Sequence, residues 1–237
     1  MVHHTKQILS LFTAGIFIVG AGFAGMANGA SGNAPISSAR QKAPAQKATQ
    51  KITRANLAKS ASFKVTQTIA PVGSKPLVRT FVVEVKGEKA RMDYDDPALG
   101  PVRYVANSKG VFFYMPGNET AIKQEYQGGV EGALRVAFAQ ANERLAKAKK
   151  VGKATVSGQP TVIYKDPETG TLVYLGTKKG FELPVKTELK NEGGKNTVLV
   201  TDIKLNVAIP DTRFALPAGT QIIDSKDSPG VGLPIGP

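Results

Sequence analysis

The sequence contains no cysteine, no tryptophan and only two histidines among its 237 residues. Both histidines, His3 and His4, lie at the N-terminus, within a segment that has the pattern of an export signal. Without cysteine or histidine in the rest of the chain, disulfides and the usual zinc sites are excluded, and no histidine is present to activate a serine nucleophile. The exported chain must therefore hold its fold together by burying apolar side chains, and its length suits a single domain.

Residues 1–30 carry the export signal. His3, His4 and Lys6 precede an apolar run over residues 8–23, and small residues follow it. We expect cleavage after Ala27 or Ala30; the alternative is that the run stays as a membrane anchor, for which it is short. No cysteine follows the run, so the chain cannot be acylated there as a bacterial lipoprotein is.

Composition divides the remaining residues into three parts. Residues 31–48 are rich in Ala, Ser, Pro, Lys and Gln, which is typical of a disordered linker. Residues 49–224 carry the patterning of one folded domain, which is expected to begin with a modest helix over residues 49–60. Residues 225–237 form a tail rich in Ser, Pro and Gly that is expected to be flexible.

The net charge is strongly positive, +13, from 31 basic and 18 acidic residues. A basic surface can meet anionic lipid or acidic protein, and it can also serve solubility alone. No run of Lys and Arg is interleaved with aromatic residues, so nucleic acid is not an expected partner.

Apolar and polar residues alternate with a period of two in residues 63–69, 80–86, 89–94 and 202–209. This pattern is typical of strands with one buried face. Residues 111–115 are apolar at every position, so a strand there must be covered on both faces. Short connections favour antiparallel pairing. The sequence therefore predicts a mainly β fold of about 10–11 strands that curl into an incomplete, half-open antiparallel barrel.

Gly128 and Gly129 open the best amphipathic helix pattern in the chain, residues 128–149. Leu134 and Phe138 fall on its apolar face. We expect this α-helix either to cross the open side of the sheet as a lid or to pack into the core. A barrel filled by side chains and a barrel with a ligand cavity explain the strand alternation equally well.

Few residues suit other chemistry. Asp93, Asp95 and Asp96 could bind calcium, but the glycine and distal glutamate of a calcium loop are missing, and no metal is expected. Acidic residues such as Glu84 and Asp202 could pair across the sheet as in a glycosidase, but the sequence singles out no pair. No phosphate-binding or nucleophile motif is present, so we expect no cofactor and no enzymatic activity.

Three groups of motifs, taken together, resemble the outer-membrane lipoprotein carrier (LolA) family. Residues 60–67 read SASFKVTQ, which is similar to the strand that opens the family's domain. Residues 89–94, KARMDY, and 104–116, YVANSKGVFFYMP, are similar to its central strand and hairpin. The family's closing strand and tail are similar to residues 183–184, 202–206, 209–211 and 214–217, followed by Asp224. The resemblance spans about residues 50–224.

The resemblance implies a half-open barrel with an α-helical lid over an apolar cavity, which favours the cavity over a filled barrel. It also implies a periplasmic carrier that binds the acyl chains of lipoproteins or lipids and ferries them across the envelope without covalent chemistry. We expect a monomer that receives its cargo from an inner-membrane donor complex and passes it to an outer-membrane acceptor. The first alternative is an envelope-stress sensor or binding module that acts on a protein partner, and the second is a carboxylate-dependent enzyme.

Strand alternation, read with this resemblance, predicts which side chains contact the acyl chain. The predicted lining residues are Phe63, Val65, Phe81, Val83, Val85, Met92, Val111, Phe113 and Met115 on the strands, with Leu134 and Phe138 on the lid helix. Gly128 and Gly129 are the expected lid hinge. The resemblance marks Arg91 as a candidate lid latch or headgroup contact.

Overall fold

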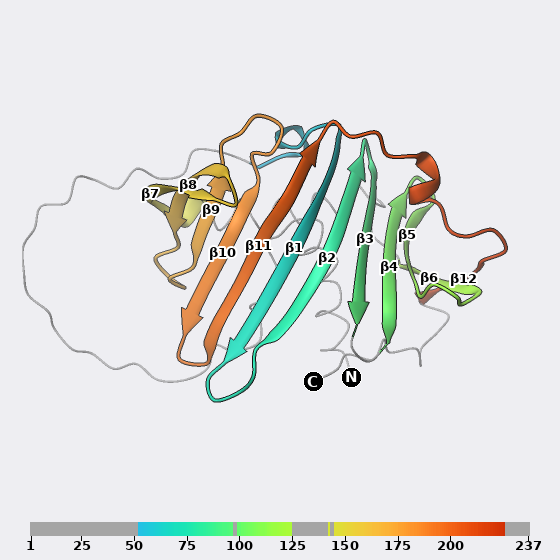
Figure 1. The fold of residues 1–237 in the computed structure, drawn as a ribbon, viewed down its shortest axis with the longest axis horizontal. Helices are drawn as coiled ribbons and strands as arrows, with labels where there is room; N and C mark the ends of the chain where they lie inside the picture. Colours follow the sequence, from blue (N-terminus) through green and yellow to red (C-terminus); the bar gives the residue numbers. More distant parts are fainter. Residues whose placement is uncertain (1–51, 97–98, 125–141, 143–144, 226–237) are drawn as a thin grey trace, which may run out of the picture.

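The computed structural model describes residues 52–96, 99–124, 142 and 145–225 (Figure 1). The expected export signal, the linker, most of the 128–149 helix and the C-terminal tail lie outside the described residues. No helix formed by the described residues is long and apolar enough to cross a bilayer.

The described chain forms one twelve-stranded sheet, in the order β12-β6-β5-β4-β3-β2-β1-β11-β10-β9-β8-β7. The strands are β1 Ser60–Pro71, β2 Leu77–Lys86, β3 Lys89–Asp96, β4 Gly100–Asn107, β5 Gly110–Tyr114, β6 Thr120–Gln124, β7 Lys149–Val156, β8 Gln159–Lys165, β9 Leu172–Gly176, β10 Pro184–Asn191, β11 Gly194–Leu205 and β12 Gln221–Asp224. Of two 3₁₀ turns, η1 (Arg54–Asn56) precedes β1 and η2 (Asp211–Phe214) lies between β11 and β12. Every neighbouring pair is antiparallel except β12 and β6, which are parallel.

The predicted mainly β, mostly antiparallel fold is confirmed, with slightly more strands than expected. Among the described residues the sheet is not closed, since β7 and β12 stand at its two ends and are not paired with each other. Figure 1 shows the long central strands β10, β11, β1 and β2 side by side, with the shorter strands at both ends turned relative to them. Register shifts interrupt the β1–β11, β9–β10 and β7–β8 pairs, and such bulges increase local twist.

Helical structure is sparse in the described residues. The helix expected over residues 49–60 is, from residue 52 onward, only the turn η1. The chain leaves this turn because Leu57 pairs with Phe181 in an isolated β-bridge and β1 begins at Ser60. Of the 128–149 helix, residues 142 and 145–147 are described as helical, and β7 already begins at Lys149.

Side-chain alternation gives the sheet two different faces. We call the core face the side that carries Phe63, Val83 and Met92, which belong to one large buried apolar cluster. The opposite side, the outer face, carries residues such as Lys64 and Glu84. The core-face cluster draws residues from β1 to β5 and from β8 to β11, so most of the sheet shares one apolar wall.

A segment that follows β11, residues 206–216, lies against the outer face near β3 and β4 (Figure 1). We call it the C-terminal strap. Its Phe214 is buried, and its Leu216 packs on a second apolar cluster formed by Val105, Tyr114 and Ala121. This cover explains why β5 is apolar on both faces, as the sequence predicted.

Candidate functional site

All nine predicted lining residues of the strands lie on the core face. Eight of them are buried members of the core-face cluster, and Met115 is partly buried against it. They come from β1, β2, β3, β5 and the residue after β5, which lie within a run of five neighbouring strands (β1 to β5) although they are up to about fifty residues apart in sequence. The structure therefore brings together the set that alternation selected. Its role in binding an acyl chain stays a prediction.

Four aromatic rings form a continuous row across this part of the core face. We call Phe81, Tyr94, Tyr104 and Phe113, one from each of β2 to β5, the aromatic row. The ring centroids are 5.2 Å apart for Phe81 and Tyr94, 6.4 Å for Tyr94 and Tyr104, and 5.2 Å for Tyr104 and Phe113. These separations lie in the range of favourable aromatic contacts. Three of the rings are buried, and Tyr94 is partly exposed.

The sequence interpretation missed the two tyrosines of this row. Alternation in residues 89–94 had placed Tyr94 on the same face as Met92, and this signal was sufficient to include it. Tyr104 lies in β4, where Val105 and Ala106 are also buried and alternation is lost. In β4 only the pairing with β3 and β5 reveals which side chains face the core.

Residues outside the strands also pack on the core face. Leu145, from the described helical residues, and Ile52, from the segment before η1, belong to the core-face cluster. Asn142 joins the two segments, because its Oδ1 accepts the Ile52 amide at 2.6 Å and its Nδ2 donates to the Ile52 carbonyl at 2.8 Å. The predicted lid residues Leu134 and Phe138, and the predicted hinge Gly128 and Gly129, lie outside the described residues.

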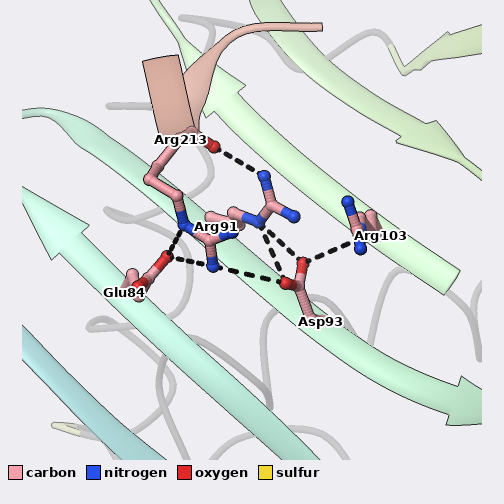
Figure 2. Close-up of polar contacts among 5 residues, drawn as sticks. All are labelled: Glu84, Arg91, Asp93, Arg103 and Arg213. Atoms are coloured by element: carbon pink, nitrogen blue, oxygen red, sulfur yellow. Dashed lines mark hydrogen bonds and ion pairs between the residues drawn. The ribbon is translucent and has the colours of Figure 1, made fainter. Parts of the chain in front are cut away.

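Arg91 does not lie with the predicted lining residues. It alternates with Ala90 and Met92 of β3, so its side chain is on the outer face, under the C-terminal strap (Figure 2). Its Nε donates to both carboxylate oxygens of Asp93, at 2.8 and 3.0 Å, and its Nη1 donates to the carbonyl oxygen of Arg213 at 2.9 Å. The Arg91 side chain is 5% exposed. In this arrangement Arg91 fixes the strap to β3.

Further charges complete this outer-face cluster (Figure 2). Arg213 of the strap reaches Glu84 on β2 and, at 3.6 Å, Asp93 on β3. Arg103 on β4 lies 3.8 Å from Asp93. The cluster joins three neighbouring strands, β2, β3 and β4, to the strap.

A polar margin borders the aromatic row on the core face. Arg79 precedes Phe81 by two residues on β2 and lies directly opposite Gln67 on β1. Burial raises the pKa of Tyr94, the Asp96 carboxylate raises it further, and the positive charge of Arg79 opposes both effects. Gln67, Arg79 and Asp96 therefore interrupt the apolar side chains of the core face beside the aromatic row.

The three aspartates considered for calcium do not converge. Asp93 is bound to Arg91 on the outer face, while the Asp96 carboxylate accepts the Leu99 amide at 3.1 Å. Within the described ranges, no three His, Cys, Asp or Glu side chains gather as metal ligands do.

A comparison with protein-family models gives no match, and a comparison with curated proteins gives none either. Solved structures with a similar chain course include a LolA superfamily protein from Nitrosomonas europaea, at 13% identity and a TM-score of 0.35, covering 67% of this chain and 90% of that one. A DUF1329 family protein from Desulfovibrio piger has 13% identity and a TM-score of 0.39, and the match covers 71% of this chain and 94% of that one. MucB has 18% identity and a TM-score of 0.43, covering 71% of this chain and 61% of its own.

The neighbours thus include the superfamily that the sequence motifs resemble, and MucB has also been solved in complex with MucA. At these identities and scores the likeness carries no conclusion about function, which must be argued from the chain's own side chains.

Proposed function

We propose that this protein is an exported module that binds hydrocarbon chains on its core face and carries acylated molecules, lipids or lipoproteins, between membranes without covalent chemistry. The observation that supports it is the continuous apolar wall of the core face, with the aromatic row at its centre. In the proposal, the export signal of residues 1–30 delivers the chain to the periplasm, where it acts as a monomer.

The free-energy scale of the proposed cargo fits such a wall. Burying one methylene is worth about 0.8 kcal/mol, so a long acyl chain resists transfer to water by roughly 10 kcal/mol. A carrier must offer apolar contact of similar extent and still release the chain. Packing against flat rings and Met92 suits this need, since aromatic and thioether groups contact irregular chains without demanding one fixed geometry.

The proposal includes a lid. Residues 128–149 would cross the core face as an α-helix, with Leu134 and Phe138 over the acyl chain and Gly128 and Gly129 as the hinge. The contacts of Asn142 with Ile52, and the buried Leu145, support attachment of the far end of this helix at the core face. Release would then require movement of the glycine end only.

The absence of tryptophan allows a direct test of where a chain binds. Tyr94→Trp places one tryptophan in the aromatic row, and Val82→Trp, on the neighbouring strand, places one on the outer face, where Val82 is 41% exposed. We expect a brominated fatty acid, added to delipidated protein, to quench the fluorescence of the first variant in a saturable manner and to leave the second nearly unchanged. Equal quenching of the two, or none in either, would contradict the proposed site.

Native mass spectrometry of protein purified without detergent tests the cargo itself. A co-purified lipid or acylated peptide is the expected result. Protein without any such species, together with recovery of one membrane regulator from envelope extract, would favour the protein-binding sensor instead.

A further inference from the structure

Arg79 is a cation on the apolar side of the sheet. The pairing of β1 with β2 places Arg79 opposite Gln67, in the same side-chain row as Phe81, Val83 and Val85. All three of these apolar residues are buried in the core-face cluster. Arg79 therefore interrupts this apolar row next to Phe81, on the same face and the same strand, with the half-buried Leu77 beyond it.

The Arg79 side chain is incompletely satisfied. Its Nε is buried and has no hydrogen-bond partner among the described residues. A buried donor without an acceptor costs about 1–3 kcal/mol, and more when it is charged. The guanidinium group matches carboxylate and phosphate oxygens better than any other side chain does, because it offers parallel N–H donors in one plane.

Arg91 also has a buried nitrogen, Nη2, without a partner among the described residues, but its situation differs. Its Nε and Nη1 are bound to Asp93 and to the Arg213 carbonyl on the outer face. Arg91 thus binds the C-terminal strap and a strand carboxylate on the outer face, whereas Arg79 lies on the core face, where the tail is proposed to bind.

The spacing suits an amphiphile. From Arg79 to Val85 the strand advances about 20 Å at about 3.4 Å per residue, comparable to an extended long acyl chain. Tyr94, the partly exposed member of the aromatic row, lies opposite Phe81 and so diagonally from Arg79 on the same face, and the positive charge of Arg79 acts to lower the Tyr94 pKa. A head at Arg79 and a tail along Phe81, Val83 and the aromatic row would occupy the polar margin and the apolar wall together.

From this placement we infer that Arg79 binds the anionic head of the amphiphile, a carboxylate or phosphate group, while the hydrocarbon tail lies on the core face. This inference rests on the proposed function and adds a preference for negative charge to it. It assigns the headgroup contact to Arg79 and not to Arg91.

The test compares charged and neutral ligands with the same tail. Oleate, oleoyl lysophosphatidic acid and the neutral monoolein are titrated into delipidated full-length protein, its Arg79→Gln variant and an Arg103→Gln control. Arg103 undergoes the same change of charge on the outer face of β4. Tail length is held constant, so differences report the head.

We expect Arg79→Gln to lower the affinity for one or both anionic ligands at least tenfold and to change the affinity for monoolein by no more than about twofold. Arg103→Gln should leave the affinity for all three ligands unchanged. The anionic ligand that loses more affinity shows whether the natural head is a carboxylate or a phosphate. If all three ligands bind and Arg79→Gln affects them equally or not at all, the inference is wrong while the proposed function stands. If none binds to the unaltered protein, the proposed function fails and the inference fails with it. Urea denaturation of each variant separates a loss of binding from a loss of fold.

Discussion

Arg213 in the C-terminal strap holds the carboxylate of Glu84 on β2 with two nitrogens, Nε at 2.9 Å and Nη2 at 2.8 Å from the same oxygen. The two residues are 129 positions apart in sequence. Their contact fastens the C-terminal strap to β2 and, with the hydrogen bond of Arg91 to the Arg213 carbonyl, holds the strap against the outer face near β3 and β4 (Figure 2).

Replacing Arg213 with methionine should therefore loosen the strap. The Arg213 side chain is 38% exposed, so solvent screens the pair, and we expect the free energy of unfolding to fall by about 1 kcal/mol. Lys64→Met is the matched control, because the pair of Lys64 and Asp202 is 44% and 61% exposed and should contribute almost nothing. Urea denaturation measures both, and equal effects would remove the special role of the Arg213 pair.

Asp93 and Arg91 should respond unequally to mutation. Asp93→Asn leaves Arg91, whose side chain is 5% exposed, without its counter-charge, and we expect a loss of about 3 kcal/mol in the free energy of unfolding. Arg91→Met removes the buried charge itself, and Asp93 keeps Arg103 and Arg213 within 4 Å, so the loss should be smaller. Urea denaturation of the two variants shows which one loses more free energy of unfolding. A greater loss from Arg91→Met would show that the hydrogen bond to the Arg213 carbonyl outweighs the charge balance.

Alternation alone was enough to predict the strands that bury one face. Phe63 and Val65 of β1, and Val83 and Val85 of β2, were identified because a polar residue separates the members of each pair. The same pattern separated Arg91 from Met92 and so favoured the outer face, whereas the family resemblance had assigned Arg91 a role at the cavity. The local pattern of the strand proved the better guide to where Arg91 lies.

Other parts of the fold depend on contacts that no local pattern carries. Alternation did not identify the strand β4, because the strap covers its second face and Val105 is buried as well as Tyr104. The short strand β12 exists through parallel pairing with β6, about a hundred residues earlier in the chain. Arg79 was not singled out, because a lone arginine in a strand has no sequence signature; its interest arises from the pairing that places it beside Gln67 and near Tyr94.

The stability of the sheet should depend on pH through Glu188 on the outer face of β10. Burial alone would raise the pKa of this carboxyl, but hydrogen bonds from Lys186, Lys195 and Tyr174 outweigh it, and the pKa is lowered from the ordinary value of 4.5. A lowered pKa means that the folded state holds the charged form more strongly than the unfolded chain does. The stability from this site is present above pH 4.5 and is lost as the pH falls through the folded-state pKa.

We therefore expect Glu188→Gln to reduce the acid dependence of the free energy of unfolding, measured by urea denaturation at a series of pH values. Glu192→Gln, in the exposed turn between β10 and β11, is the control for the loss of one carboxylate. Carbon NMR should place the Glu188 titration below 4.5 and shift it upward in Lys195→Met. A Glu188 titration at or above the ordinary value would contradict the proposed hydrogen-bond balance.

Gly194, at the start of β11, is required where the β10–β11 turn meets the end of β1. Its φ is +136°, and a Cβ there would overlap the Ala70 carbonyl oxygen and lie 2.8 Å from the Pro71 Cα. Backbone atoms of a paired strand cannot move aside without breaking the β1–β11 ladder. Gly194→Ala should therefore combine backbone strain with a steric clash and lower the free energy of unfolding by about 3 kcal/mol.

Gly158, in the turn between β7 and β8, isolates the strain from the clash. Its φ is +73° and a Cβ would meet nothing within 4 Å, so Gly158→Ala should cost only about 1 kcal/mol. Because β1 and β11 carry Phe63, Val65 and Val200 of the core face, Gly194→Ala should also weaken fatty-acid binding under conditions in which it remains folded, and Gly158→Ala should not. Equal losses of stability in the two variants would mean that the turn moves away from Pro71 to accept the methyl group. Equal binding would mean that the core face does not depend on the register of its two longest strands.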